Sequence, residues 1–170
     1  MQTQPQNIAA ARQATLLTIN SLFRRPLFHD TDAARAVSRL HLEPQIWGPS
    51  RYLAWVLMPD SWQALVLIGA NDSADRLVRR FKAISSRVVE PRFRVNGWLW
   101  SRGFVEQAVG IDEDVQGVAR RIIGDPVRAG LARSVGAYPY WNAIWLDAAP
   151  AQTGVHCDLL TRSQANTMTG

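Results

Sequence analysis

The strongest constraint on the fold of this chain is a pair of short apolar segments joined by a tight turn. The segments Arg51–Leu57 and Gln63–Ile68 flank the sequence Met58-Pro59-Asp60. Apolar runs of this length, rich in β-branched and aromatic residues, are typical of strands, and Pro-Asp is typical of a turn. The sequence therefore predicts two neighbouring antiparallel strands.

Segments on both sides of this hairpin alternate between strand-like and helical patterns. Further strands are predicted at Ala14–Asn20 and Gly103–Val109, and helices at Thr31–Leu42, Ala74–Val89 and from Asp112 to about Gly124. Asp30 or Thr31 caps the first helix, Asn71-Asp72-Ser73 caps the second, and Pro126 ends the third. The order strand, helix, strand, strand, helix, strand predicts an α+β, ferredoxin-like (RRM-like) fold. This is an antiparallel four-stranded sheet with helices on one face, here with an extra C-terminal helix.

Length and composition predict one globular domain in the cytoplasm. The chain has 170 residues, of which 47% are hydrophobic, and this is enough for one core. We expect flexible tails at 1–12 and 147–170 around a domain at 13–146. The apolar runs are too short to cross a bilayer, and we expect no signal peptide and no membrane association. The single cysteine, Cys157, excludes an internal disulfide and suits a reducing compartment.

The charge of the chain gives only a first indication of a partner. The formal net charge is +5, and all but one of the 19 basic residues are arginine. A basic surface suits phosphate, and arginine suits both phosphate forks and base stacking. A GC-rich genome produces the same excess of arginine, so composition alone leaves nucleic-acid binding open.

Five segments, collinear and sensibly spaced between about residues 14 and 145, share one resemblance. They are Arg24–Phe28, Arg51–Asp60, Trp100–Phe104, Asp112–Leu131 and Tyr138–Trp141. Together they resemble the REP-associated tyrosine transposases, bacterial single-tyrosine HUH enzymes of DNA transposition. The resemblance implies binding to hairpins formed by imperfect palindromes and cleavage of single-stranded DNA beside them. In active relatives it also implies a divalent metal, Mg²⁺ or Mn²⁺, and a tyrosine nucleophile.

The positions that carry this chemistry in the family are occupied by other residues here. Ser61 and Gln63 stand where the family has two histidines, which share one face of a strand because side chains alternate. Arg121 stands where the family has the tyrosine, and a guanidinium cannot attack phosphorus. Asp125 replaces an asparagine; with Gln63 it is a weak candidate ligand for a hard cation. We therefore expect no strand cleavage and no cofactor.

No other residue is expected to rebuild the catalytic site. The three tyrosines are Tyr52, Tyr138 and Tyr140, and packing in the core is the natural interpretation of each. The three histidines, His29, His41 and His156, include no pair at the spacing of metal ligands. The chain is thus interpreted as a degenerate member, a pseudoenzyme.

Binding of DNA is the property that we expect to persist. The expected DNA-binding residues lie on the second helix and the loop after it: Arg76, Arg79, Arg80, Lys82, Arg87, Arg92, Arg94, Trp98 and Arg102. Basic residues of the helix form a solvated stripe for phosphates, and Trp98 suits stacking on unpaired bases, whereas Trp100 fits better in the core. Arg24, Arg25 and Arg128 are further phosphate candidates.

Three functional hypotheses follow from these residues. The first is a transposase-like protein that binds single-stranded or hairpin DNA without cutting it, as a monomer or a homodimer. The second is an active metal-dependent nuclease or transposase that uses Gln63, Asp125 and an unexpected nucleophile. The third is a protein-interaction module with neither DNA nor catalysis.

Overall fold

The structure, a computed structural model, describes residues 13–110 and 113–146 and contains one five-stranded antiparallel sheet. The strands are β1 (Ala14–Asn20), β2 (Arg51–Met58), β3 (Ser61–Leu67), β4 (Val105–Ala108) and β5 (Trp141–Ala143), in the order β4-β1-β3-β2-β5. The predicted hairpin is confirmed, with Met58 opposite Ser61 across the β2–β3 turn. The expected tails and the ends of the chain, with His156 and Cys157, lie outside the described residues.

The sheet differs from the prediction at both of its edges. The fifth strand, β5, was not predicted, because three residues are too few to show a strand pattern and pairing with β2 is what makes them extended. At the other edge, β4 is shorter than expected, and all four of its residues are exposed. The prediction of an antiparallel sheet in an α+β fold is confirmed, and the number of strands is corrected from four to five.

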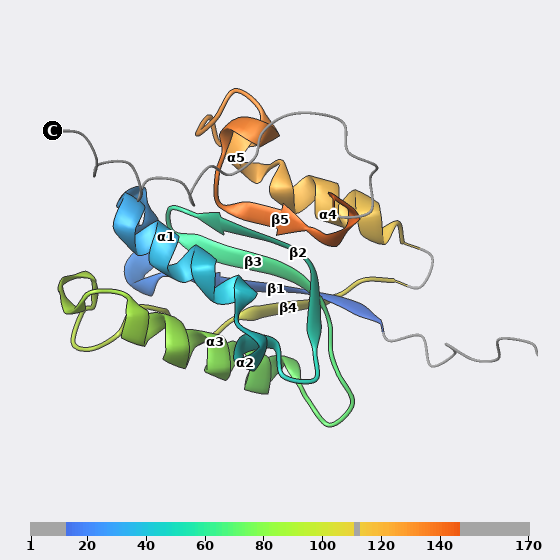
Figure 1. Cartoon of the computed structure of the whole chain (residues 1–170), viewed down its shortest axis with the longest axis horizontal. Coiled ribbons are helices and arrows are strands. Elements are labelled where there is room, and N and C mark those ends of the chain that lie inside the picture. The colour runs from blue at the N-terminus through green and yellow to red at the C-terminus, as the bar shows by residue number, and fades with distance from the viewer. Residues whose placement is uncertain (1–12, 111–112, 147–170) are drawn as a thin grey trace, which may run out of the picture.

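Helices cover both faces of the sheet. Helices α1 (Thr31–Arg39), α2 (Pro44–Trp47) and α3 (Ala74–Val88) lie on one face, as Figure 1 shows. Helices α4 (Val115–Ile123) and α5 (Asp125–Arg128) lie on the other, where α4 contacts β2, β3 and β5. Short 3-10 helices join these elements at Leu22–Arg24, Leu27–His29, Leu40–Leu42, Pro91–Phe93, Val135–Ala137 and Ile144–Leu146. No helix among the described residues is long and apolar enough to span a membrane.

Local capping chemistry sets the helix starts. The Asp30 carboxylate accepts hydrogen bonds from the backbone N–H groups of Asp32 and Ala33, both at 3.0 Å, and Ser73 caps α3 through the N–H of Arg76 at 3.2 Å. Helix α4 ends at Ile123, before Pro126, as the sequence predicted; a separate short helix, α5, follows and has Pro126 in its first turn. Proline is tolerated there because the N–H that it lacks would have no helical partner.

A buried aromatic cluster joins α1, α2 and α3 to the sheet. The His41 ring stacks on Trp55 at a centroid distance of 3.6 Å and accepts a hydrogen bond from Trp62 Nε1 at 2.7 Å. Burial lowers the pKa of His41 from 6.5 to about 3, so the ring is neutral and its Nδ1 donates to the Ser38 carbonyl at 3.0 Å. Trp100 is 2% exposed and donates to Ser85 Oγ at 2.8 Å. Trp100 therefore belongs to the core, as the sequence favoured.

Candidate functional site

The two residues that the resemblance aligns with the family's histidines lie at the start of β3. Ser61 and Gln63 share the sheet face that α4 covers, and Trp62 between them is fully buried against the opposite face. This follows from the alternation of side chains along a strand. The predicted common face of the two positions is therefore present.

Gln63 and Asp125, which are far apart in sequence, are in direct contact. Gln63 Nε2 donates to Asp125 Oδ2 at 2.8 Å, and this bond joins β3 to the first turn of α5. The other carboxylate oxygen of Asp125 forms an ion pair with Arg128, whose guanidinium also donates to the Arg121 carbonyl. Gln63, Asp125, Arg128 and the backbone of Arg121 thus form one hydrogen-bonded cluster.

This cluster fits a divalent metal poorly. Both oxygens of Asp125 are engaged by protein donors, so a cation would have to displace the positively charged Arg128. Ser61 Oγ donates to Asp60 Oδ1 at 3.3 Å. Across residues 13–110 and 113–146 there is no group of three His, Cys, Asp or Glu side chains that could hold a metal. The cluster can hold α5 against the sheet, but it offers no group of unoccupied side chains that could bind a metal.

The tyrosines pack against the core, as expected. Tyr138 is 8% exposed, and its hydroxyl donates to the Leu57 carbonyl at 2.7 Å. Burial and the neighbouring Tyr140 raise the pKa of Tyr138 to about 12. Tyr52 and Tyr140 are partly buried against the core. Arg121, which the resemblance aligns with the family's tyrosine nucleophile, is exposed on α4.

The expected basic stripe on α3 is only partly solvated. Arg76 and Arg79 are exposed, and Arg79 pairs with Asp75 at 2.9 Å within the helix. The Arg80 side chain is 29% exposed and forms two hydrogen bonds with the Asp72 carboxylate, at 3.0 and 2.7 Å. Arg80 also donates to the carbonyls of Ile46 and Trp47, both at 3.1 Å. Its expected place in the solvated stripe is corrected: Arg80 fastens α2 to α3.

Lys82 also departs from the expected solvated stripe. Its ammonium group donates to three backbone carbonyls of the loop after Trp100, those of Ser101, Arg102 and Gly103, at 2.6, 3.1 and 2.8 Å. Partial burial lowers its pKa. Because its three donors are occupied, Lys82 is a clamp between α3 and this loop. Sequence reasoning could not distinguish this lysine from a solvated one, because the carbonyls come from residues 19–21 positions away.

The other candidates differ in exposure. Arg92 pairs with Glu90 at 2.9 Å and Asp30 at 3.7 Å, and its guanidinium lies 4.7 Å from the centre of the Phe93 ring. Arg94 donates to the Val89 carbonyl at 3.0 Å and is half-buried. Arg87 and Arg102 are exposed. The basic candidates on α3 and its loop that remain well exposed are Arg76, Arg79, Arg87, Arg92 and Arg102.

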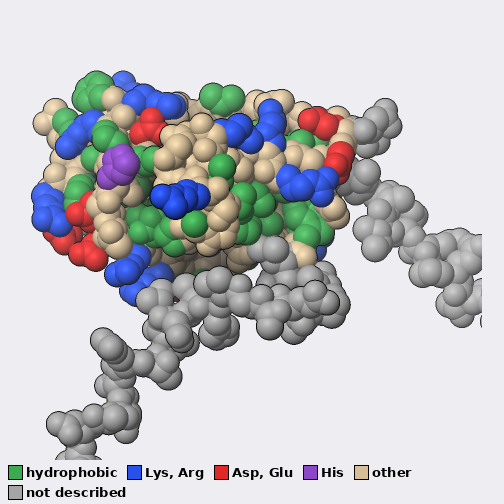
Figure 2. Space-filling view, turned by 90° about the horizontal axis from the view of Figure 1, so that it is seen from above, with side chains coloured by type: hydrophobic (Ala, Val, Ile, Leu, Met, Phe, Trp, Pro, Cys, Tyr) green, Lys and Arg blue, Asp and Glu red, His purple; other side chains and the backbone are tan. Residues whose placement is uncertain are grey.

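Basic side chains also occur away from α3. Figure 2, which views the molecule from above Figure 1, shows Lys and Arg in separate groups among apolar and acidic side chains. Two of the weaker candidates are engaged in ion pairs: Arg24 with Asp60 at 2.9 Å, and Arg128 with Asp125. Arg25 is half-buried.

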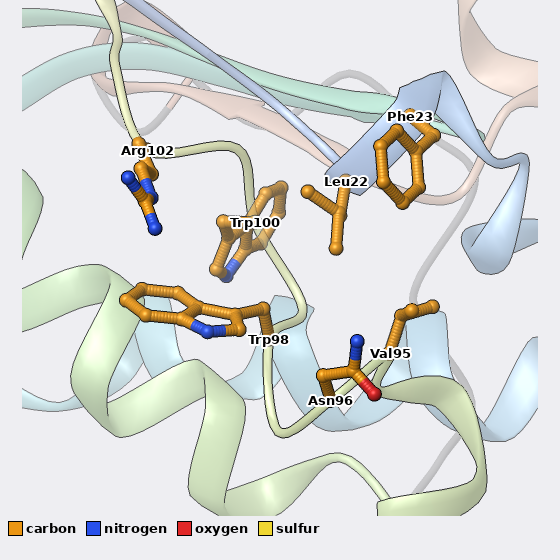
Figure 3. Close-up of a pocket in the computed structure, with 7 residues that line it drawn as sticks. All are labelled: Leu22, Phe23, Val95, Asn96, Trp98, Trp100 and Arg102. Carbon is orange, nitrogen blue, oxygen red and sulfur yellow. The ribbon is translucent and has the colours of Figure 1, made fainter.

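A pocket of about 300 Å³ joins the predicted DNA-binding residues Trp98 and Arg102 to residues that were not among the predicted DNA contacts. Its further lining residues are Leu22, Phe23, Val95, Asn96 and Trp100. In Figure 3, Arg102 and Phe23 stand at opposite ends, Leu22 and Trp100 lie between them, and Trp98 and Asn96 border the near side. The Asn96-Gly97 sequence is typical of a turn, so this side of the pocket could be predicted. Nothing in the sequence around Phe23 predicts its left-handed backbone, with a φ of 58°.

Comparison with known proteins shows the fold. No family model matches the sequence, and no curated protein is significantly similar to it. A solved REP-associated tyrosine transposase bound to a REP hairpin superposes with a TM-score of 0.60 at 17% identity, covering 98% of this chain and 100% of that one. A candidate transposase from Deinococcus radiodurans R1 gives a TM-score of 0.49 at 14% identity, over 72% of this chain and 97% of that one. The described residues therefore have the fold of a REP-associated tyrosine transposase.

Proposed function

We propose that this protein is a transposase-like DNA-binding protein that recognises folded single-stranded DNA, palindromic hairpins above all, and does not cut it. The proposal joins two findings to the five segments that resemble the REP-associated tyrosine transposases. The fold is shared with a transposase solved on a REP hairpin. Exposed arginines on α3 and its loop, with exposed Trp98 beside Arg102, offer contacts to phosphates and to unpaired bases.

The observation that carries the loss of cleavage is the Gln63–Asp125–Arg128 cluster. Cleavage by this family's chemistry needs a metal beside the scissile phosphate and a nucleophile in reach. At these positions the chain has an amide donating to a carboxylate, and an ion pair that neutralises that carboxylate. Arg121 and the buried Tyr138 supply no nucleophile. The site supports a structural polar contact better than catalysis.

Binding is tested by fluorescence anisotropy with a labelled palindromic DNA hairpin between 50 and 200 mM salt. We expect affinity to fall with salt, and Arg79→Ala and Arg87→Ala each to lower the slope of log K against log salt by about 1, because each removes one phosphate contact. Arg133→Ala is the matched control, since Arg133 is exposed but lies after α5, away from α3. Hairpin binding that is independent of salt contradicts the role of these arginines; no binding at all favours the protein-interaction module.

Cleavage is tested by incubating the same hairpin, with single-stranded flanks, with the protein and Mn²⁺. We expect no covalent protein–DNA adduct on a denaturing gel. The triple variant Ser61→His, Gln63→His and Arg121→Tyr restores the family's residues and shows whether the scaffold can still support the reaction. An adduct with the wild-type chain refutes the proposed inactivity and favours the second hypothesis, a variant nuclease.

A further inference from the structure

We propose that the pocket between Phe23 and Trp98 holds one unpaired nucleobase of the bound DNA strand, with the neighbouring phosphate on Arg102. This rests on the proposed function and names what the protein reads besides the phosphate backbone. The occupant is one base because the pocket, at about 300 Å³, lies at the lower end of the range of small-ligand sites, about 300–1,000 Å³.

The aromatic residues of the pocket carry the first part of the argument. Trp98 is 54% exposed and Phe23 is 75% exposed, the largest aromatic exposures of the described chain. Both line the same pocket, with Leu22 and the buried Trp100 between them (Figure 3). A flat base stacks on such surfaces whatever its sequence, because every base has a π-face. An aliphatic occupant would leave the polar end of the pocket unmatched.

The polar end of the pocket suits a nucleotide. Arg102 is exposed, and it has no carboxylate partner among residues 13–110 and 113–146. The exposed amide of Asn96 offers both a donor and an acceptor, as the edge of a base requires. A guanidinium beside an indole, with an amide opposite, combines phosphate contact, stacking and edge recognition in one small site.

Both rims of the pocket are stabilised by local contacts. Phe23 and Arg24 have left-handed φ angles of 58° and 54°, which bulky residues rarely adopt, and Arg24 stabilises this bend by its contacts to Asp60 at 2.9 Å and Asn20 at 2.7 Å. On the other rim, Val95 and Trp98 exchange two backbone hydrogen bonds of 2.9 Å around the Asn96-Gly97 turn. Preorganised rims reduce the entropy lost when a base binds.

The pocket lies between α3 and the start of β3, where Ser61 is located, so a bound DNA strand could approach both. Ser21, next to pocket residue Leu22, pairs with Trp100, and Asn20 pairs with Ser61 at the start of β3. On the other side, Lys82 of α3 clamps the loop that carries Arg102. A DNA strand bound in the pocket would therefore lie between the loop that Lys82 of α3 holds and the end of the sheet at which β3 begins.

The test uses the full chain and a DNA hairpin with a short unpaired flank that carries 2-aminopurine, compared with the same hairpin carrying an abasic site there. We expect the wild-type chain to quench 2-aminopurine fluorescence and to bind the base-containing flank roughly tenfold more tightly than the abasic one. Trp98→Ala and Phe23→Ala are expected to reduce both effects. Leu42→Ala is the control, because Leu42 is 78% exposed but lies outside the pocket.

The possible results separate the pocket from the proposed function. If the wild-type chain binds both hairpins equally, or if Trp98→Ala weakens both by the same factor, the pocket does not hold a base although DNA binding stands. If the chain binds neither hairpin, the proposed function fails and this inference fails with it. Circular dichroism and the affinity for the abasic hairpin show whether each variant is folded. Trp98→Phe keeps a smaller aromatic ring and is expected to retain part of the quenching.

Discussion

Replacing Arg80 by alanine is expected to lower the free energy of unfolding strongly. The same change at Arg79 is expected to have almost no effect on it. The two arginines are adjacent on α3 and look equivalent in the sequence. The Arg79 side chain is 78% exposed and pairs only with half-exposed Asp75. The Arg80 side chain is 29% exposed, and its partner, the Asp72 carboxylate, is 2% exposed.

The magnitude follows from what each change leaves behind. Without Arg80, the buried Asp72 carboxylate keeps the Ser50 hydroxyl, at 2.6 Å, and the backbone N–H of Ser73, but loses its counter-charge. The Ile46 and Trp47 carbonyls each lose one donor. Removing one partner of a buried ion pair costs about 3–5 kcal/mol. Removing one partner of an exposed i,i+4 pair, as in Arg79→Ala, costs about 0.3–0.5 kcal/mol.

Urea denaturation of the two variants and the wild type at pH 7 measures this difference, with the slope of the transition checked for two-state behaviour. Arg80→Lys is expected to recover only part of the loss, since an ammonium group cannot make the forked contact to Asp72. If Arg80→Ala costs less than about 1 kcal/mol but lowers the salt dependence of DNA binding, the structural assignment is refuted. Arg80 would then be the phosphate contact that the sequence indicated.

Three further predictions test other parts of the structure. Because the pKa of His41 is about 3 in the folded chain against 6.5 for a free histidine, the unfolded chain takes up the proton first, and stability is lost as the pH falls below 6.5. We expect a loss of about 2 kcal/mol between pH 6.5 and pH 5 by urea denaturation, and a weaker pH dependence in His41→Gln; an unchanged slope in that variant contradicts the assignment. Lys82→Met removes the donor from three loop carbonyls, and we expect it to lower stability by about 1–2 kcal/mol and to weaken quenching of 2-aminopurine; quenching equal to the wild type argues against a clamp. A Cβ at Gly69 would lie 2.1 Å from the Pro49 carbonyl oxygen, whereas a Cβ at Gly97 would meet no atom within 4 Å, and only the φ of 82° disfavours alanine there. We therefore expect Gly69→Ala to lower the melting temperature much more than Gly97→Ala. Equal melting temperatures would contradict this packing.

Several features of the fold and site were determined by the sequence alone. The β2–β3 hairpin, the caps at Asp30 and Ser73 and the helical span of α3 depend on residues within a few positions of one another, and the structure confirms them. The common face of Ser61 and Gln63 follows in the same way from the two-residue period of a strand. The identities of Ser61, Gln63 and Arg121 are likewise facts of sequence, and the resemblance implies that they stand in place of two imidazoles and a phenol.

Other features were decided only by the tertiary structure. The contacts of Gln63 with Asp125, Arg80 with α2 and Lys82 with the 101–103 loop each join groups that are distant in the chain or on different elements. The pocket similarly brings Phe23 to Trp98. A charged or aromatic side chain has the same local pattern whether it meets solvent or a buried carbonyl. The environment of such a side chain depends on which distant backbone groups still need a hydrogen-bond partner after the helices pack on the sheet, and only the tertiary structure decides this.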